Sequence, residues 1–148
     1  MNRLSLFNTH PRYLDLASLL IRLAIAGLML THGWPKLNQL LAGGEIQFAD
    51  PLGLGPGISL GLAVFAEFFC SILLALGLFT RLALLPLIST MLVAAFITHG
   101  GDPLGKKELA LLYLLIYLLL LAVGPGRYSL DYLIRRQQTA SHPKSRIQ

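Results

Sequence analysis

One apolar stretch limits what this chain can fold into more than any other feature. Residues 58–79 form a run of 22 residues in which Glu67 is the one ionisable side chain. As an α-helix this run is about 33 Å long, which is enough to cross the hydrocarbon core of a bilayer. A carboxylate at that depth is costly, so we expect Glu67 to face protein or trapped water and to have a partner.

The composition also indicates a membrane protein. The chain has 148 residues, enough for one domain, and is 55% hydrophobic and 13% charged. Its net charge of +5 comes mainly from basic residues near the two ends, which fits membrane topology better than nucleic-acid binding. Because Cys70 is the one cysteine, the chain has no internal disulfide or CxxC pair, and we expect Cys70 simply to pack.

The apolar runs predict an all-α fold, an antiparallel four-helix transmembrane bundle. A short segment at 1–13 precedes a membrane domain at 14–133, and a basic cytoplasmic tail follows at 134–148. The helices are predicted at about 14–34, 58–79, 82–98 and 108–123, with Pro35 ending or kinking the first. The long connection at 35–57 either folds back over the mouth between the helices or is an inert surface loop.

The distribution of Lys and Arg predicts the orientation. With four crossings, both termini and the turn at 80–81 share one side, which carries eight basic residues, whereas the other side carries three. Both termini are therefore predicted to be cytoplasmic. The eight are Arg3, Arg12, Arg81, Arg127, Arg135, Arg136, Lys144 and Arg146; the three are Lys36, Lys106 and Lys107.

A polar stripe on the first helix provides a partner for Glu67. Asp15, Arg22, Met29 and Lys36 recur every seven residues, a spacing that stays on one face of a helix in a left-handed bundle. Counted from the expected helix ends, Arg22 and Glu67 differ in depth by about 4 Å, within reach of an arginine side chain. We therefore predict an Arg22–Glu67 ion pair, with a structural role favoured over a ligand or proton route.

A second polar group is predicted at the outer surface, where several helices end. Two histidines on different helices could ligate haem or a metal, but they follow no ligand spacing, and we predict no metal site. Tyr113 and Tyr117 lie one turn apart and either pack in the bundle or stack on a quinone-like ring. The outer group comprises His32, Lys36, His99, Asp102 and Glu108.

Several segments together resemble the DoxX family of small four-helix membrane proteins. They are GLMLTHGWPKL after Arg22, AEFFCSILLALGLFTR ending at Arg81, KELALLYL, and GPGRYSLD at 124–131, and the resemblance covers about 17–133. It implies an integral subunit of the bacterial cytoplasmic membrane, associated with quinone-coupled thiosulfate oxidation or with thiol and oxidative stress. Arg22, Glu67, His99 and Glu108 match the family's recurring polar positions.

Two classes of function follow, and the sequence leaves open whether the protein is an enzyme. In the first, it is a subunit of a quinone-linked redox complex: Arg22 and Lys36 hold an anionic substrate, and Glu67 or His99 relays a proton. The sequence encodes no cofactor, so in this function the electrons come from a bound quinone, an added cofactor or a partner chain, which is either a redox subunit or a second copy in a homo-oligomer. In the second, it is a non-catalytic scaffold, assembly factor or small-molecule carrier, and the Arg–Glu pair is structural. A transporter is a weaker alternative because no inverted repeat is visible.

Overall fold

A computed structural model describes residues 12–141 of the protein, with side chains through residue 138. Within this range the regular structure is entirely helical, as predicted. The predicted segment 1–13, apart from its last two residues, and the end of the predicted tail lie outside the described residues. The elements are α1 (Arg12–Ala42), α2 (Pro56–Val64), the π-helix η1 (Phe65–Cys70), α3 (Ser71–Leu76), α4 (Thr80–Leu92), the π-helix η2 (Val93–Thr98), α5 (Leu104–Val123) and α6 (Leu130–Ser141).

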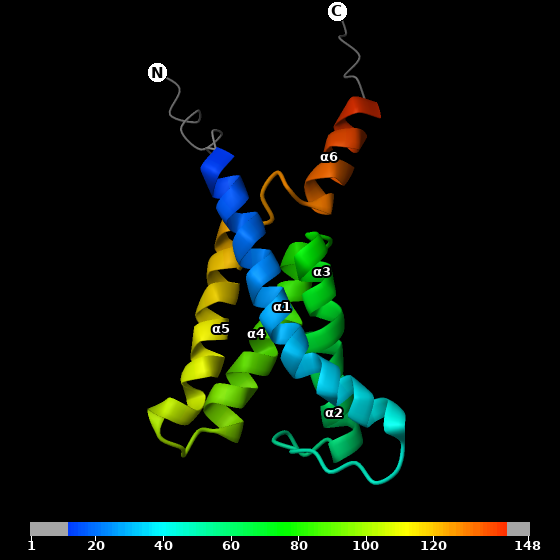
Figure 1. Ribbon diagram of the computed structural model, residues 1–148, viewed down its shortest axis with the longest axis vertical. Helices are drawn as coiled ribbons and strands as arrows, with labels where there is room; N and C mark the ends of the chain where they lie inside the picture. The colour runs from blue at the N-terminus through cyan, green and yellow to red at the C-terminus, as the bar shows by residue number, and fades with distance from the viewer. Residues whose placement is uncertain (1–11, 142–148) are drawn as a thin grey trace, which may run out of the picture.

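The elements combine into a few long rods that alternate in direction (Figure 1). α2, η1 and α3 follow one another without a break, and so do α4 and η2. α1 runs diagonally across them and packs on α2, η1 and α3, while α4 packs on α5. The start of α1, the turn between α3 and α4, and α6 lie at one end of the molecule, opposite the connection that follows α1.

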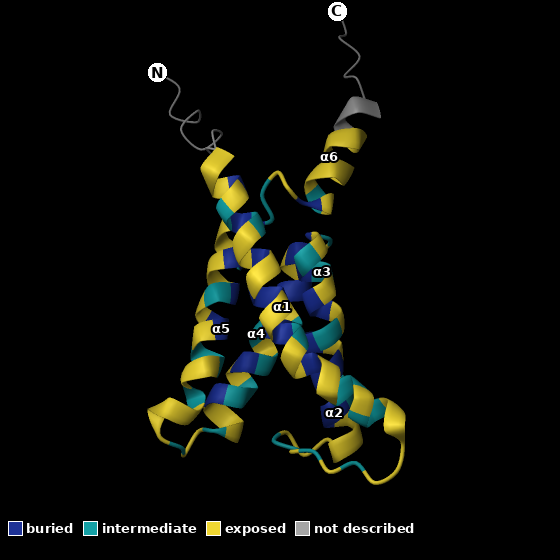
Figure 2. Ribbon diagram, in the orientation of Figure 1, coloured by how far each residue is buried: buried dark blue, intermediate teal, exposed yellow. Residues whose placement is uncertain are grey.

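Three of these rods, α1, Pro56–Leu76 and Thr80–Thr98, are long and apolar enough to cross a membrane. α5 has 20 residues, but Lys106, Lys107 and Glu108 near its start leave an uncharged stretch of 15 residues, 109–123. Exposed leucine, isoleucine and phenylalanine side chains cover the outer faces of the rods. Buried residues gather where the rods meet at mid-height (Figure 2), so the molecule presents apolar side chains both to its core and to its surroundings.

The predicted end of the first helix at 34 is wrong, because α1 continues through Pro35 to Ala42. A proline inside a helix removes one backbone hydrogen bond, and transmembrane helices tolerate this loss when their neighbours pack well. Packing is tight here: Gly33 is buried against η1, and Lys36 on the next turn pairs with Glu67. These contacts on both sides of Pro35 hold α1 as one helix.

Other boundaries shift as well. The second rod covers 56–76 instead of 58–79, because Gly77 adopts a left-handed conformation (φ 67°) and ends α3. The third begins at Thr80 and the fourth at Leu104, each earlier than predicted. Where a basic tail was predicted from 134, the structure has the amphipathic helix α6.

α1 and η1 cross closely at Gly33. A Cβ atom placed on Gly33 would lie 2.7 Å from the carbonyl carbon of Glu67 and 2.9 Å from the nitrogen of Phe68. Real side chains do not approach backbone atoms so closely, so only glycine allows this crossing. Gly27, on the same helix, has nothing within 4 Å of the same position.

This difference gives a matched pair of variants. Gly33→Ala should lower the free energy of unfolding by about 1–3 kcal/mol, because the added methyl forces the two helices apart. Gly27→Ala should be neutral or stabilise by up to about 1 kcal/mol, because alanine is the better helix former. Unfolding of the detergent-solubilised protein by titrated SDS, followed by circular dichroism, measures both. Equal stability of the two variants would contradict the close crossing.

Candidate functional site

Glu67 lies in η1 and forms an ion pair with Lys36 of α1. The side chain of Glu67 is 6% exposed and that of Lys36 is 26% exposed, so the carboxylate is the more deeply placed partner. One face of this rod is buried, and Glu67 and Cys70 lie on it as expected, together with Ala63, Ser71 and Leu74. Glu67 thus has a cationic partner, as a carboxylate at this depth requires.

The predicted partner was wrong, because Arg22 does not pair with Glu67. α1 extends eight residues beyond the expected end at 34, so depths counted from that end misplaced Arg22. Gly33, which touches the backbone of Glu67, follows Arg22 by 11 residues, or about 16 Å along the helix. Arg22 therefore lies at a different depth from Glu67, toward the end of the molecule where α1 begins (Figure 1).

Arg22 binds backbone carbonyls instead. Its fully buried guanidinium donates from Nη1 to the carbonyl oxygen of Leu74 (3.2 Å) and from Nη2 to that of Tyr128 (2.6 Å). Leu74 belongs to the last turn of α3, and its carbonyl also accepts from the amide of Gly77 (3.1 Å); the negative end of a helix favours a cation at this position. Asp131 is the carboxylate that interacts with Arg22 electrostatically. Arg22 therefore joins α1, the end of α3 and the connection before α6.

The GPGRYSLD segment completes this end of the molecule. The Ser18 hydroxyl donates to the carbonyl of Gly124 (3.1 Å), and Asp15 accepts from the backbone amide of Arg127 (3.0 Å). Asp131 accepts from the amides of Phe79 (2.8 Å) and Thr80 (2.9 Å), which begin α4. Burial alone would raise the pKa of Asp131, but hydrogen bonds from the Thr80 amide and side chain and from the Phe79 amide, together with the charge of Arg135, outweigh it and hold the pKa below its ordinary value. The polar stripe of α1 faces inward as predicted, and at this end its role is structural.

The Lys36–Glu67 pair forms part of the wall of a cavity of about 560 Å³. Most of the lining is apolar and comes from α2, η1, α4 and η2, with Ser59, Thr90 and His99 as further polar members. The connection after α1 also contributes, through Phe48, Ala49, Pro51 and Leu52. The connection therefore covers the cavity, which favours the first of the two predicted roles for 35–57.

Asp50 fastens this connection to α2. Its carboxylate accepts hydrogen bonds from the Ser59 hydroxyl (2.7 Å) and from the amides of Leu54 (2.9 Å) and Gly55 (2.7 Å). The hydrogen bond from Ser59 lowers the pKa of Asp50 most, followed by the bond from the Gly55 amide. The carboxylate therefore stays ionised at neutral pH and keeps these hydrogen bonds. Asp50 was not among the predicted site residues, although Asp-Pro followed by two glycines, as at 50–55, is a typical turn signal.

Both π-helices line the cavity. Phe65, Ala66 and Glu67 come from η1, and Val93, Ala94 and Thr98 come from η2. The amide of His99 donates to the carbonyl of Ala94 (3.0 Å), the i to i−5 bond of a π-turn. Such wide turns are rare, and they occur frequently at functional sites. Two of them in the lining of one cavity identify it as the candidate site.

The remaining predicted site residues lie in the cavity wall, in the core or at the exposed surface. His99 lines the cavity, and its Nδ1 lies 2.8 Å from Asp102. Tyr113 and Tyr117 are buried in the core behind the cavity, with ring centroids 6.0 Å apart, and both interact electrostatically with Glu67. His32 is exposed and meets the edge of Tyr113, while Glu108 is exposed and outside the cavity lining.

The arrangement can hold an amphipathic small molecule. Its apolar walls suit a ring or an alkyl chain, and the ammonium of Lys36 and the carboxylate of Glu67 offer a donor and an acceptor at one edge. Across the described residues, no group of three or more His, Cys, Asp or Glu side chains could hold a metal ion. The fold and site together define a small helical membrane protein with a polar ion pair at an apolar cavity.

The chain belongs to the DoxX family, whose model matches residues 17–100. It is 30% identical to inner membrane protein YqjF of Escherichia coli over 127 residues, which cover 83% of this chain and 95% of that protein. It is also 34% identical to an uncharacterised membrane protein of Mycobacterium tuberculosis, covering 68% of this chain and 77% of that one. No solved structure matches with significant similarity. The protein is therefore a multi-pass integral protein of the bacterial inner membrane.

Removing one partner of the ion pair tests the site geometry. Lys36→Met should lower the free energy of unfolding by about 2 kcal/mol or more, because it leaves the carboxylate of Glu67 buried and unpaired. Lys106→Met is the control: this exposed lysine lies 3.6 Å from Asp102 and should contribute under about 1 kcal/mol. SDS titration measures both variants. A loss for Lys36→Met no larger than for Lys106→Met would mean that Glu67 has no need of Lys36.

Proposed function

We propose that the protein is the quinone-binding membrane subunit of a redox complex that handles sulfur compounds or thiols. The observation that carries this proposal is the Lys36–Glu67 pair in the wall of an apolar cavity of about 560 Å³. A quinone combines a flat apolar ring and tail with two carbonyl oxygens, and it needs both a hydrogen-bond donor and a group that exchanges protons. Membership of the DoxX family supports the same choice.

The chain's own residues have distinct roles in this function. Lys36 donates a hydrogen bond to a ring carbonyl oxygen, and Glu67 takes or returns the proton that accompanies reduction or oxidation of the ring. His99, held by Asp102 at the other side of the cavity, exchanges protons with the outside. Arg22, a candidate at the outset, is too far from the cavity for any of these roles and acts in the fold.

A quinone supplies two-electron chemistry when bound, but its electrons need a donor or acceptor on another chain. The described residues offer no metal-ligating cluster, and Cys70, the one thiol, is buried in the hydrophobic core. A partner redox subunit is therefore part of the proposal. The second candidate, a non-catalytic carrier of an amphipathic molecule, uses the same cavity without electron transfer.

Filling the cavity should abolish quinone binding. Ala94 lines the cavity, while Ile97 in the same π-helix is 52% exposed and outside the lining. Ala94→Phe should weaken binding of a short-chain ubiquinone by at least about tenfold, or about 1.4 kcal/mol, and Ile97→Phe should leave it unchanged. Equilibrium binding to the purified protein in detergent measures both. If the unaltered protein does not bind the quinone, the proposal fails; if it binds but native membranes contain no electron-transfer partner, the carrier function replaces it.

This function fits a topology with four crossings and both termini in the cytoplasm. α5 would be the fourth crossing: it packs along α4, and Tyr113, Leu114, Tyr117 and Leu120 belong to the core. The end of the molecule with Arg12, Arg81, Arg127, Arg135 and Arg136, here called the arginine end, would face the cytoplasm. The cavity would then open toward the periplasmic half of the membrane.

Labelling of single cysteines tests this topology. In a Cys70→Ser background, Lys107→Cys should react with a membrane-impermeant maleimide in intact spheroplasts, whereas Arg136→Cys should react only after the membrane is opened. The Cys70→Ser change removes the one native cysteine, which is buried, so that only the introduced cysteine can react. Reaction of both cysteines in intact spheroplasts would place the two positions on the same side and remove the fourth crossing.

A further inference from the structure

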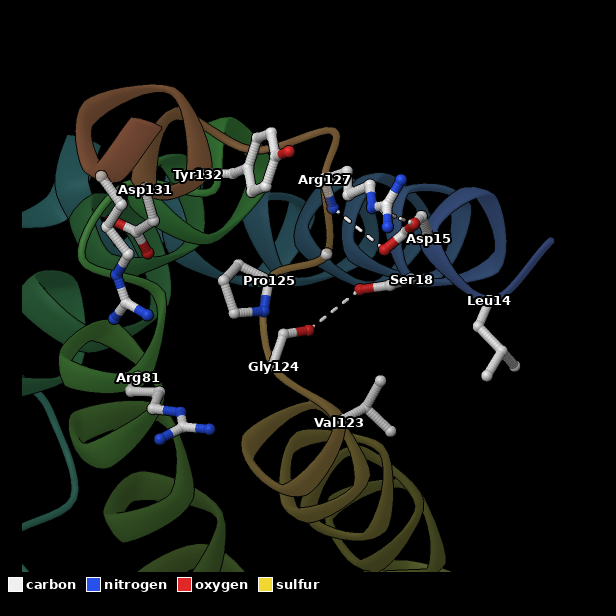
Figure 3. A pocket seen from close by; sticks show the side chains of 12 residues that line it. Leu14, Asp15, Ser18, Arg81, Val123, Gly124, Pro125, Arg127, Asp131 and Tyr132 are labelled. Carbon is white, nitrogen blue, oxygen red and sulfur yellow. Dashed lines mark hydrogen bonds and ion pairs between the residues drawn. The ribbon is translucent and has the colours of Figure 1, made fainter. Parts of the chain in front are cut away.

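A second cavity, of about 340 Å³, lies at the arginine end, away from the Lys36–Glu67 pair. Its walls come from the first turns of α1, the first turn of α4, the end of α5 with the connection that follows it, and α6 (Figure 3). The two sequence segments that carried much of the family resemblance, GLFTR and GPGRYSLD, meet here. The structural role of GPGRYSLD is described above, but that role does not involve Arg81.

The cavity is lined by three arginines and two aspartates, and both aspartates are already engaged by the fold. Asp15 accepts from the amide of Arg127 and lies 3.5 Å from the Nε of the same residue. Asp131 accepts from the two amides that begin α4. The arginines are Arg81, Arg127 and Arg135. The cavity therefore has an excess of positive charge.

Arg81 is the cation that the fold leaves uncompensated. Its side chain is exposed and forms no hydrogen bond or ion pair with any described residue. In Figure 3 it extends toward the end of α5, and a Cβ atom on Gly124 would lie 3.8 Å from its Nη2. The guanidinium thus borders the cavity with its donors available.

We propose that this cavity binds the phosphate of an anionic phospholipid. A guanidinium presents paired N–H donors that match phosphate oxygens, and basic pockets at the ends of membrane helices suit anionic headgroups. The source is a lipid because the cavity has an apolar side: Leu14 and Val123 line it and are 39% and 49% exposed.

Lipid retention by the full-length protein tests this site. The protein is purified in mild detergent, exchanged into micelles with equal phosphatidylglycerol and phosphatidylcholine, and its bound lipid is counted by native mass spectrometry. The unaltered protein should retain phosphatidylglycerol preferentially, and Arg81→Gln should lower its retention about fivefold. Arg136→Gln removes the same charge at the same end from a residue outside the cavity, and it should retain phosphatidylglycerol normally.

Two further measurements test whether the lipid occupies the cavity itself and whether the ligand is a lipid or a soluble phosphate. Val123→Trp fills the cavity without changing its charge and should also reduce phosphatidylglycerol retention, so it decides the question if Arg81→Gln does not fold. Millimolar glycerol phosphate or inorganic phosphate should leave the bound lipid in place. Equal losses for Arg81→Gln and Arg136→Gln, full retention by Val123→Trp, or displacement by the soluble phosphates would each overturn the proposal.

Discussion

A buried guanidinium needs acceptors around it in an apolar interior, and the two Nη atoms of Arg22 find them in the carbonyls of two separate segments, while its Nε has no hydrogen-bond partner among the described residues. Leu74 lies in the last turn of α3, where its carbonyl also accepts from the amide of Gly77, and Tyr128 offers its carbonyl because the connection after α5 passes alongside. Gly77 has to be glycine at this point: a Cβ atom on it would lie 2.2 Å from Nη1 of Arg22. One side chain thus determines how α1, α3 and the segment before α6 meet.

Because its two Nη atoms bind backbone carbonyls, Arg22 does not pair with Glu67, and the carboxylate has a different partner further along α1. Lys36 fills that role, and the resulting pair lies in a cavity wall instead of between two packed helices. A buried ion pair is weak evidence for stability, since apolar residues of similar size often stabilise as well. The pair lines one cavity together with residues of two π-helices, a placement that makes sense if a ligand uses it. Arg22 therefore stabilises the fold, whereas Glu67 belongs to the proposed site.

The sequence predicted the helices and the inward polar stripe well, because apolar runs and a seven-residue spacing depend on local chain geometry alone. It predicted the Arg22–Glu67 pair wrongly, because that inference took Pro35 as a helix end. Lys36 already belonged to the predicted stripe with Asp15 and Arg22, and a helix continued through Pro35 would have identified it as the partner of Glu67. The cavity, its cover at 48–52 and the two π-helices depend on how distant segments pack, and no local pattern indicates them.

The central claim is that Glu67 is coupled to Lys36 and not to Arg22. Double-mutant cycles test it most directly: unfolding free energies of Glu67→Leu, Lys36→Met, Arg22→Met and the two double variants containing Glu67→Leu give one coupling energy for each pair. The structure predicts a coupling of about 1–3 kcal/mol for Lys36 with Glu67 and less than about 0.5 kcal/mol for Arg22 with Glu67. A larger coupling for Arg22 than for Lys36 would contradict the account.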